Sequence, residues 1–180
     1  MTIDPSIALA SRLLGALVFL TAVAGKLAHR HELAGVVVNY RLVPEPLAAS
    51  MAWLVVGLES LVTVSLATGL YARSGAALAI ALLCGFALAM GINLVRGRRE
   101  IDCGCFQSGL RQSLSPGLLV RNLVLALALS PLFAATSAWG GPLQWVDGVG
   151  AGLAAYGLYR TFDQLLSLRQ STAELRKRFA

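Results

Sequence analysis

The stretch SGAALAIALLCGFALAMGINLV, residues 74–95, contains no charged side chain. A helix needs about 20 consecutive apolar residues to span the hydrocarbon core of a bilayer. This stretch therefore predicts a membrane-spanning helix. The small residues of 67–91, which are alanine, glycine and serine, are typical of helices that pack closely against one another inside a membrane.

The composition of the whole chain agrees with this prediction. Of the 180 residues, 57% are hydrophobic and 13% are charged, whereas soluble domains have about 25% charged residues. No Ser/Pro-rich linker divides the chain, so residues 1–180 are expected to form a single integral membrane domain in the lipid bilayer. The net charge of +6 does not indicate nucleic-acid binding, because no basic patch alternates with aromatic residues. No nucleotide-binding, hydrolase or kinase motif is visible.

Other apolar stretches predict the remaining spans. Pro116 follows Ser115, which is a favourable cap for a helix start. The tail from 160 to 180 predicts a short amphipathic helix. The fold class is therefore all-α, a polytopic transmembrane helix bundle of four or five spans with a short cytoplasmic C-terminal helix. The further spans are 7–28, 47–70, 116–138 and, as the fifth candidate, the short Gly-rich segment 143–159.

The start of the chain also has features of a secretory leader. The segment LLGALVFLTAVA before Gly25 combines an apolar core with small residues. Against that interpretation, the first basic residue is Arg12, and the remainder of the chain is membrane-embedded as well. We therefore expect 7–28 to be a retained span.

Lys and Arg side chains orient the predicted bundle, because cytoplasmic loops of membrane proteins are rich in them. With five spans, the loops 26–46 and 96–115 share one side with the tail. That side holds twelve Lys and Arg residues, and the opposite side holds Arg12 and Arg73. This count places the first side in the cytoplasm. With four spans the tail moves across, and the count becomes seven against seven.

The loop 96–115 contains Cys103 and Cys105, separated by one glycine. Such a pair can close a small strained disulfide ring, and strained disulfides are readily reduced, which suits thiol exchange. Glycine permits the backbone angles that the ring needs. A thiolate at either cysteine would be disfavoured by the negative charges of Glu100 and Asp102. It would be stabilised by three nearby arginines, Arg98, Arg99 and Arg111. The alternative is two ordinary loop cysteines.

Two further interpretations concern the other thiol and a metal. His29 and His31, with the cysteine pair, would make a Cys₂His₂ set of the kind that zinc prefers. Histidines beside a membrane are more often simply solvated. Cys84, inside the span 74–95, is expected to be a small buried packing residue. The alternative interpretation is that Cys84 acts as a third thiol and resolves a mixed disulfide.

Glu59 lies at the centre of the span 47–70. A carboxylate there is costly, so it is expected to face the interior with a partner or to stay protonated. Lys26 and Arg12 are the available cations. One interpretation is an ion pair that holds helices together, and the other is a proton relay coupled to thiol or quinone chemistry.

Three segments resemble the MauE family of methylamine utilisation membrane proteins and its DoxX-like relatives. DCGCFQSG resembles the Cys-Gly-Cys-Phe segment of that family. RLLGALVFLTAVAGKLAH is similar to its first helix, and GLESLVTVSLATGL to its second. The resemblance covers roughly residues 10–135. Where relatives commonly have glycine directly after the phenylalanine, this chain has Gln107.

The resemblance implies a protein of the bacterial inner membrane. It would support maturation of the small subunit of methylamine dehydrogenase, which is periplasmic and rich in disulfides, through disulfide formation, processing or export. It implies a thioredoxin-like periplasmic partner, a MauD-like protein, that exchanges electrons with Cys103 and Cys105. Electrons could flow outward to this partner or from it to a quinone. The alternative is a non-redox membrane scaffold or transport component with structural or metal-binding cysteines.

The positive-inside count and the resemblance disagree about the working face of the cysteine pair. Five spans place the pair in the cytoplasm, whereas the implied client is periplasmic. Three resolutions are open: 143–159 does not cross, the loop re-enters the bundle, or the pair is not the direct donor. We favour the re-entrant loop.

Overall fold

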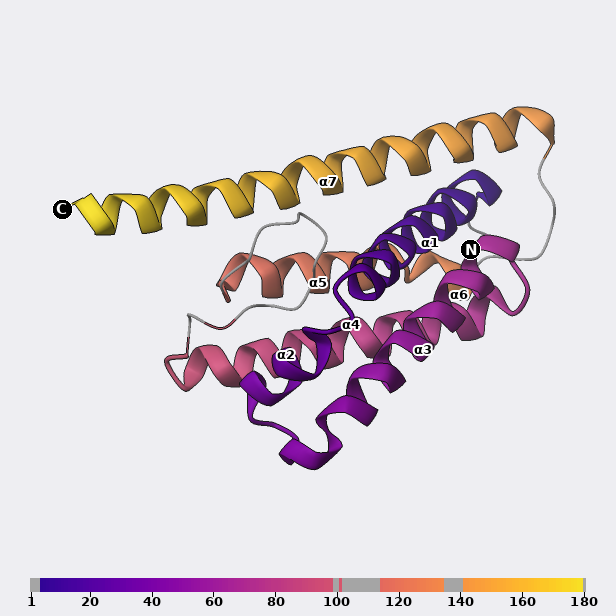
Figure 1. Cartoon of the computed structure of the whole chain (residues 1–180). Coiled ribbons are helices and arrows are strands. Elements are labelled where there is room, and N and C mark those ends of the chain that lie inside the picture. Colours follow the sequence, from indigo (N-terminus) through magenta and orange to yellow (C-terminus); the bar gives the residue numbers. More distant parts are fainter. Residues whose placement is uncertain (1–3, 99–100, 102–113, 135–140, 180) are drawn as a thin grey trace.

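A computed structural model describes residues 4–98, 101, 114–134 and 141–179, and this part of the chain is built from helices joined by turns (Figure 1). The predicted all-α architecture is confirmed. In chain order the helices are α1 Pro5–Ala28, α2 Leu33–Tyr40, the short 3₁₀ helix η1 Glu45–Leu47, α3 Ala48–Thr68, α4 Ala72–Val95, α5 Pro116–Ala128, α6 Pro131–Ala134 and α7 Pro142–Phe179.

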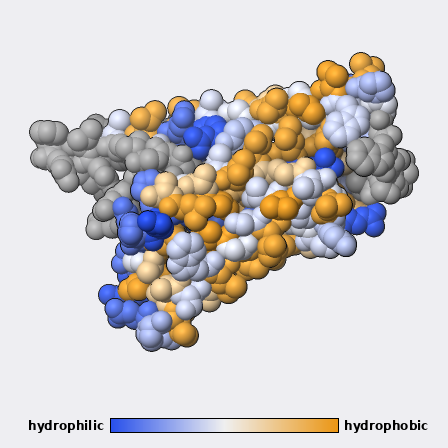
Figure 2. Space-filling view, turned by 45° about the vertical axis from the view of Figure 1, so that its right-hand side comes forward, coloured by the Kyte–Doolittle hydropathy of each residue, from blue (hydrophilic) through white to orange (hydrophobic). Residues whose placement is uncertain are grey.

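Within the described residues, four helical segments are long and apolar enough to cross a membrane. They agree within a few residues with the spans predicted from the sequence. Hydrophobic residues occupy the middle of the molecular face in Figure 2, and hydrophilic residues gather toward its ends. The chain is therefore a multi-pass membrane protein. The four segments are Pro5–Ala28, Glu45–Thr68, Ala72–Val95 and Pro116–Ala134.

Local chemistry accounts for where the first helices begin and end. The side chain of Asp4 accepts a hydrogen bond of 2.9 Å from the backbone N–H of Ser6 and so caps α1. Helix α3 ends at Thr68 and is capped by Gly69, whose φ of 77° lies in the left-handed region that favours glycine. A Cβ atom at Gly69 would lie 2.5 Å from Nη1 of Arg12. Arg12 therefore packs against the end of α3.

The fourth span differs from the prediction of one helix over 116–138. Helix α5 ends at Ala128, and α6 begins at Pro131. Proline has no N–H to donate to the carbonyl of Leu127, and its ring clashes with that carbonyl, so the helix is interrupted there. Residues 135–138 lie outside the described part of the chain.

The segment 26–46 was expected to be a loop, but it contains the short helix α2. Its buried residue Leu33 packs with Val23 of α1 and with Ala52 and Val56 of α3. This apolar contact holds α2 across the ends of two spans. With eight residues, α2 is too short to be stable alone, so its packing rather than its propensity stabilises it.

The C-terminal part of the chain corrects a third prediction. The candidate span 143–159 and the expected separate tail helix form one continuous helix, α7, of 38 residues. No glycine or proline occurs from Leu158 to Phe179, so nothing in the sequence stops the helix at Arg160. Helix α7 is not among the four segments that qualify as spans by composition.

Helix α7 nevertheless packs along the bundle and runs in the same direction as α1 (Figure 1). A Cβ atom at Gly148 would lie 2.9 Å from Leu9, and one at Gly152 would lie 3.0 Å from Leu13. These glycines let the two backbones approach closely, as small residues do in membrane helix pairs. Farther along, Leu166 lies against Gly117 at the start of α5.

Gly148→Leu is predicted to destabilise the protein, because the new side chain would meet the Cβ of Leu9 at 2.9 Å and the carbonyl oxygen of Ser6 at 3.0 Å. Overpacking of this kind costs about 1–3 kcal/mol. Thermal unfolding of the purified protein in detergent should show a melting temperature lower by about 2–10 °C. Gly150→Leu is the matched control, since a Cβ there meets nothing within 4 Å. Equal losses in both variants would contradict the described contact between α1 and α7.

Candidate functional site

A cavity of about 230 Å³ lies between the helices of the bundle. Most of the side chains around it are apolar, and the charged and amide exceptions come from three different helices, α1, α3 and α5. The cavity is therefore a site where separate spans bring polar groups together inside an apolar surrounding. Its lining includes Phe19, Lys26, Val37, Tyr40, Glu59, Phe86, Met90, Arg121, Asn122, Leu125 and Tyr159.

Lys26 and Glu59 form an ion pair in the wall of this cavity. Nζ of Lys26 donates to Oε1 of Glu59 at 2.7 Å and to Oε2 at 2.9 Å. Glu59 is 1% exposed, and the side chain of Lys26 is 13% exposed. The ammonium group also lies 5.7 Å from the ring centroid of Phe86. Glu59 thus faces the interior with a cation, as its position in the sequence predicts, and its role as a proton relay stays a prediction.

The sequence left two candidate partners for Glu59, and the structure distinguishes them. Lys26 lies in the last turn of α1 and reaches the middle of α3. Arg12 lies about four turns earlier on α1, where it packs against Gly69. The pairing with Lys26 joins α1 to α3 at a fixed height in the bundle.

A second buried ion pair links α5 to α7. Nη1 of Arg121 donates to Oδ1 of Asp163, and both side chains are 5% exposed or less. The ring of Tyr159 lies 5.7 Å from Cζ of Arg121. Sequence reasoning missed this pair, although Arg121 is the one charge in the predicted span 116–138 and gives the same signal as Glu59. Asp163 lies in the tail 160–180, for which the sequence predicts only a short amphipathic helix.

Asn122 is a third polar feature of the cavity. It is 4% exposed and contributes to the lining. Within the described part of the chain, its side-chain amide makes no hydrogen bond. An amide carries two donor hydrogens and an acceptor oxygen, so it has full capacity to bind a polar group in the cavity.

The segment that carries Cys103 and Cys105 lies outside the described residues, but its two ends do not. The backbone N–H of Leu114 donates to the carbonyl of Ile101 at 3.1 Å. Both residues pack in an apolar cluster with Met90 and Tyr40, which also line the cavity. The two ends of the cysteine segment are therefore joined to each other beside the cavity wall.

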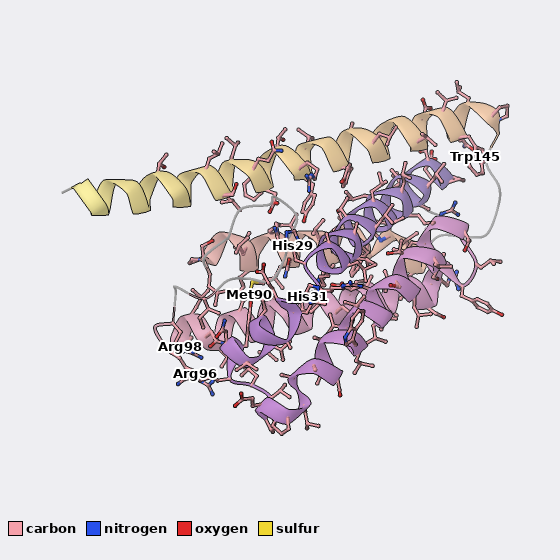
Figure 3. The ribbon with its side chains drawn as sticks, viewed as in Figure 1. His29, His31, Met90, Arg96, Arg98 and Trp145 are labelled. Carbon is pink, nitrogen blue, oxygen red and sulfur yellow. The ribbon has the colours of Figure 1, made fainter. Side chains whose placement is uncertain are left out.

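The remaining candidate residues lie apart from the cavity. His29 and His31 are exposed in the turn after α1, and Nδ1 of His29 lies 3.0 Å from the carbonyl oxygen of Gly25 (Figure 3). Within the described residues no group of three or more His, Cys, Asp or Glu side chains is placed to hold a metal ion. The two cysteines of the suggested zinc set lie outside this part.

The prediction that Cys84 is a buried packing residue is wrong. Cys84 is exposed on α4. The interior positions of α4 recur every three or four residues, and Cys84 follows directly after one of them, so it points outward. Those interior positions include Ala76, Ala79, Leu83, Ala87 and Met90.

Comparison with known families identifies the relationship. The model of the methylamine utilisation protein MauE family matches residues 4–140. The chain belongs to the MauE family. It is 44% identical over 129 residues to methylamine utilization protein MauE of Paracoccus denitrificans, covering 71% of this chain and 69% of the relative. To MauE of Paracoccus versutus it is 36% identical over 181 residues, covering 97% of each.

A third relative, MauE of Methylorubrum extorquens, is 42% identical over 112 residues, which cover 62% of this chain and 60% of the relative. No solved structure matches the chain. The resemblance seen in the sequence is confirmed, and membership of the MauE family connects the protein with methylamine utilisation.

Lys26→Met is predicted to lower stability by about 3–5 kcal/mol, because it leaves the carboxylate of Glu59 buried without its cation. The double variant Lys26→Met/Glu59→Leu should recover most of this loss, since well-packed apolar side chains replace a buried ion pair at little cost. The free energies of unfolding of the single and double variants are measured on the purified proteins in detergent. A double variant as unstable as Lys26→Met would contradict the importance of this pairing.

Proposed function

We propose that this MauE-family protein is a thiol–disulfide exchange protein of the bacterial inner membrane. Cys103 and Cys105 cycle between a dithiol and a disulfide and exchange electrons with a thioredoxin-like, MauD-like periplasmic protein. The client is the small subunit of methylamine dehydrogenase, whose maturation depends on correct disulfides. The observation that carries the proposal is the contact between Ile101 and Leu114, the described residues on either side of the cysteine segment, beside a cavity whose lining includes polar side chains.

The anchoring involves residues close to the cysteines in the chain. Ile101 precedes Cys103 by two residues and accepts the hydrogen bond from Leu114. Ile101 packs with Met90 and Tyr40, which belong to the cavity lining. A thiol pair that follows Ile101 by two and four residues in the sequence would be suited to passing electrons between a protein partner and a membrane carrier.

The exchange step itself requires no further oxidant. A thiolate of the dithiol form attacks the disulfide of the partner and forms a mixed disulfide. The second cysteine then attacks its neighbour and releases the partner with both of its thiols reduced. Two electrons pass to the partner, and the Cys103–Cys105 bond forms; the reverse sequence oxidises the partner.

The packing of α7 bears on the face from which the pair works. Because α7 accompanies α1 in the same direction, it supports the five-helix arrangement, in which the tail shares an end with the segment 96–115. Figure 3 shows Arg96 and Arg98 at the opposite end of the bundle from Trp145. The positive-inside rule favours the cytoplasm for the arginine-rich end. Exchange with a periplasmic partner then requires access to the pair through the bundle, as a re-entrant segment provides.

Replacement of either cysteine tests the proposal. In a Cys84→Ser background, Cys103→Ser and Cys105→Ser should each abolish client maturation, because one thiol cannot reform the disulfide. One of the two variants should accumulate a mixed disulfide with the thioredoxin-like partner, seen as a reductant-sensitive band on a non-reducing gel. His29→Ala/His31→Ala is the matched control and should behave as wild type.

Normal maturation in both cysteine variants would instead indicate a membrane scaffold, and loss of maturation in the histidine variant would indicate a metal site. Access is measured in the same Cys84→Ser strain with a membrane-impermeant maleimide added to intact cells. Labelling only after mild reduction identifies a disulfide that is reachable from the periplasm. Absence of labelling in intact cells, with reversible labelling after lysis, would contradict direct exchange with a periplasmic partner.

A further inference from the structure

Thiol–disulfide exchange by itself assigns no role to the polar groups of the cavity. Lys26, Glu59 and Asn122 lie in a wall that is otherwise mostly apolar. Charged and amide side chains inside a membrane are costly and generally mark a functional site. The ion pair satisfies Glu59, but Asn122 faces the cavity without an intramolecular hydrogen bond in the described part of the chain. These features indicate a ligand.

The lining specifies the chemistry of that ligand. Aromatic side chains, Phe19 and Phe86, favour a flat apolar group. The ammonium of Lys26 has three N–H donors, and Glu59 accepts two of them. With the amide of Asn122, the cavity offers hydrogen-bond donors from two helices, α1 and α5. A flat ring with carbonyl oxygens fits both properties, whereas a fatty acyl chain would leave the donors unused.

The size and the opening of the cavity agree with a ring that carries an apolar tail. A cavity of about 150 Å³ is large enough to bind benzene, and this cavity measures about 230 Å³. It therefore has room for a substituted six-membered ring. Its lining includes Leu42, which is 40% exposed, so the cavity reaches the surface there. A tail can extend through this opening into the surrounding lipid.

We propose that this cavity binds the headgroup of a membrane quinone, with Lys26 and Asn122 donating hydrogen bonds to its carbonyl oxygens. The proposal rests on the thiol–disulfide function given above and names the electron carrier that acts with the cysteine pair. The dithiol of Cys103 and Cys105 loses two electrons and two protons as its S–S bond forms. The quinone gains two electrons and two protons and becomes a quinol. The pair of Lys26 and Glu59 holds an exchangeable proton at the ring oxygen.

Binding is measured on the full-length protein in detergent, in a Cys103→Ser/Cys105→Ser background, with a short-chain ubiquinone as the probe. A ligand that binds the folded state raises the melting temperature in a saturable way. Asn122→Leu removes a donor at similar volume, and Ala89→Leu fills the cavity. Each should weaken binding by about tenfold or more. The matched controls Asn39→Leu and Ala77→Leu, which change exposed residues outside the lining, should bind as the parent does.

Quinone that is extracted with the parent protein from membranes, and is depleted in Ala89→Leu, would support the proposal. The proposal would be overturned if ubiquinone did not raise the melting temperature of the parent protein, or if it raised that of all four variants equally. Extraction of a phospholipid in place of quinone would also overturn it. Because the background lacks both thiols, a failure here leaves the mixed-disulfide result unaffected. Conversely, quinone binding without any mixed disulfide would remove the exchange function and leave the cavity assignment in place.

Discussion

The ion pair between Lys26 and Glu59 is the constraint on which the bundle depends. A carboxylate at the centre of a span is tolerated when a cation lies within hydrogen-bonding distance, and Lys26 meets it at 2.7 and 2.9 Å. This requirement fixes how α1 lies along α3. The pair of Arg121 and Asp163 imposes the same kind of requirement on α5 and α7. Because Lys26, Glu59 and Arg121 all line the cavity, the interactions that set the helix register also build the site.

The site connects two features that lie far apart in the sequence. The cysteine segment begins and ends at Ile101 and Leu114, which are joined beside the cavity. The cavity itself is assembled from α1, α2, α3, α4, α5 and α7. In a membrane, where apolar contacts between helices gain little over contacts with lipid, polar pairs and close approaches at glycine determine such an arrangement.

The sequence predicted those features that depend on composition and on single costly residues. Uncharged stretches such as 74–95 are sufficient to predict spans, and the isolated charge of Glu59 is sufficient to predict a buried partner. Predictions failed where a distant contact or a local break decides the structure. Pro131 interrupts the fourth span, and the packing of Leu33 forms a helix within an expected loop.

The same limit explains the missed part of the site. Arg121 and Asp163 are 42 residues apart, and only the packing of α7 against α5 brings them together. No local pattern in the tail predicts that contact. Cys84 was expected inside the bundle because its surroundings in the sequence are apolar, but a helix that spans a membrane has an apolar outer face as well. Hydrophobicity alone therefore does not separate interior from lipid-facing positions.

The central claim, that the cysteine pair and the cavity act as one redox unit, is tested most directly by thiol oxidation in the purified protein. The reduced protein with Cys84→Ser is mixed with a short-chain ubiquinone, and the free thiols of Cys103 and Cys105 are followed by alkylation while quinol formation is followed by absorbance. We predict the loss of two thiols for each quinol formed, with a rate that falls about tenfold or more when Ala89→Leu fills the cavity and is unchanged in Ala77→Leu. Thiol oxidation at the same rate in Ala89→Leu, or quinol formation without loss of thiols, would contradict the account.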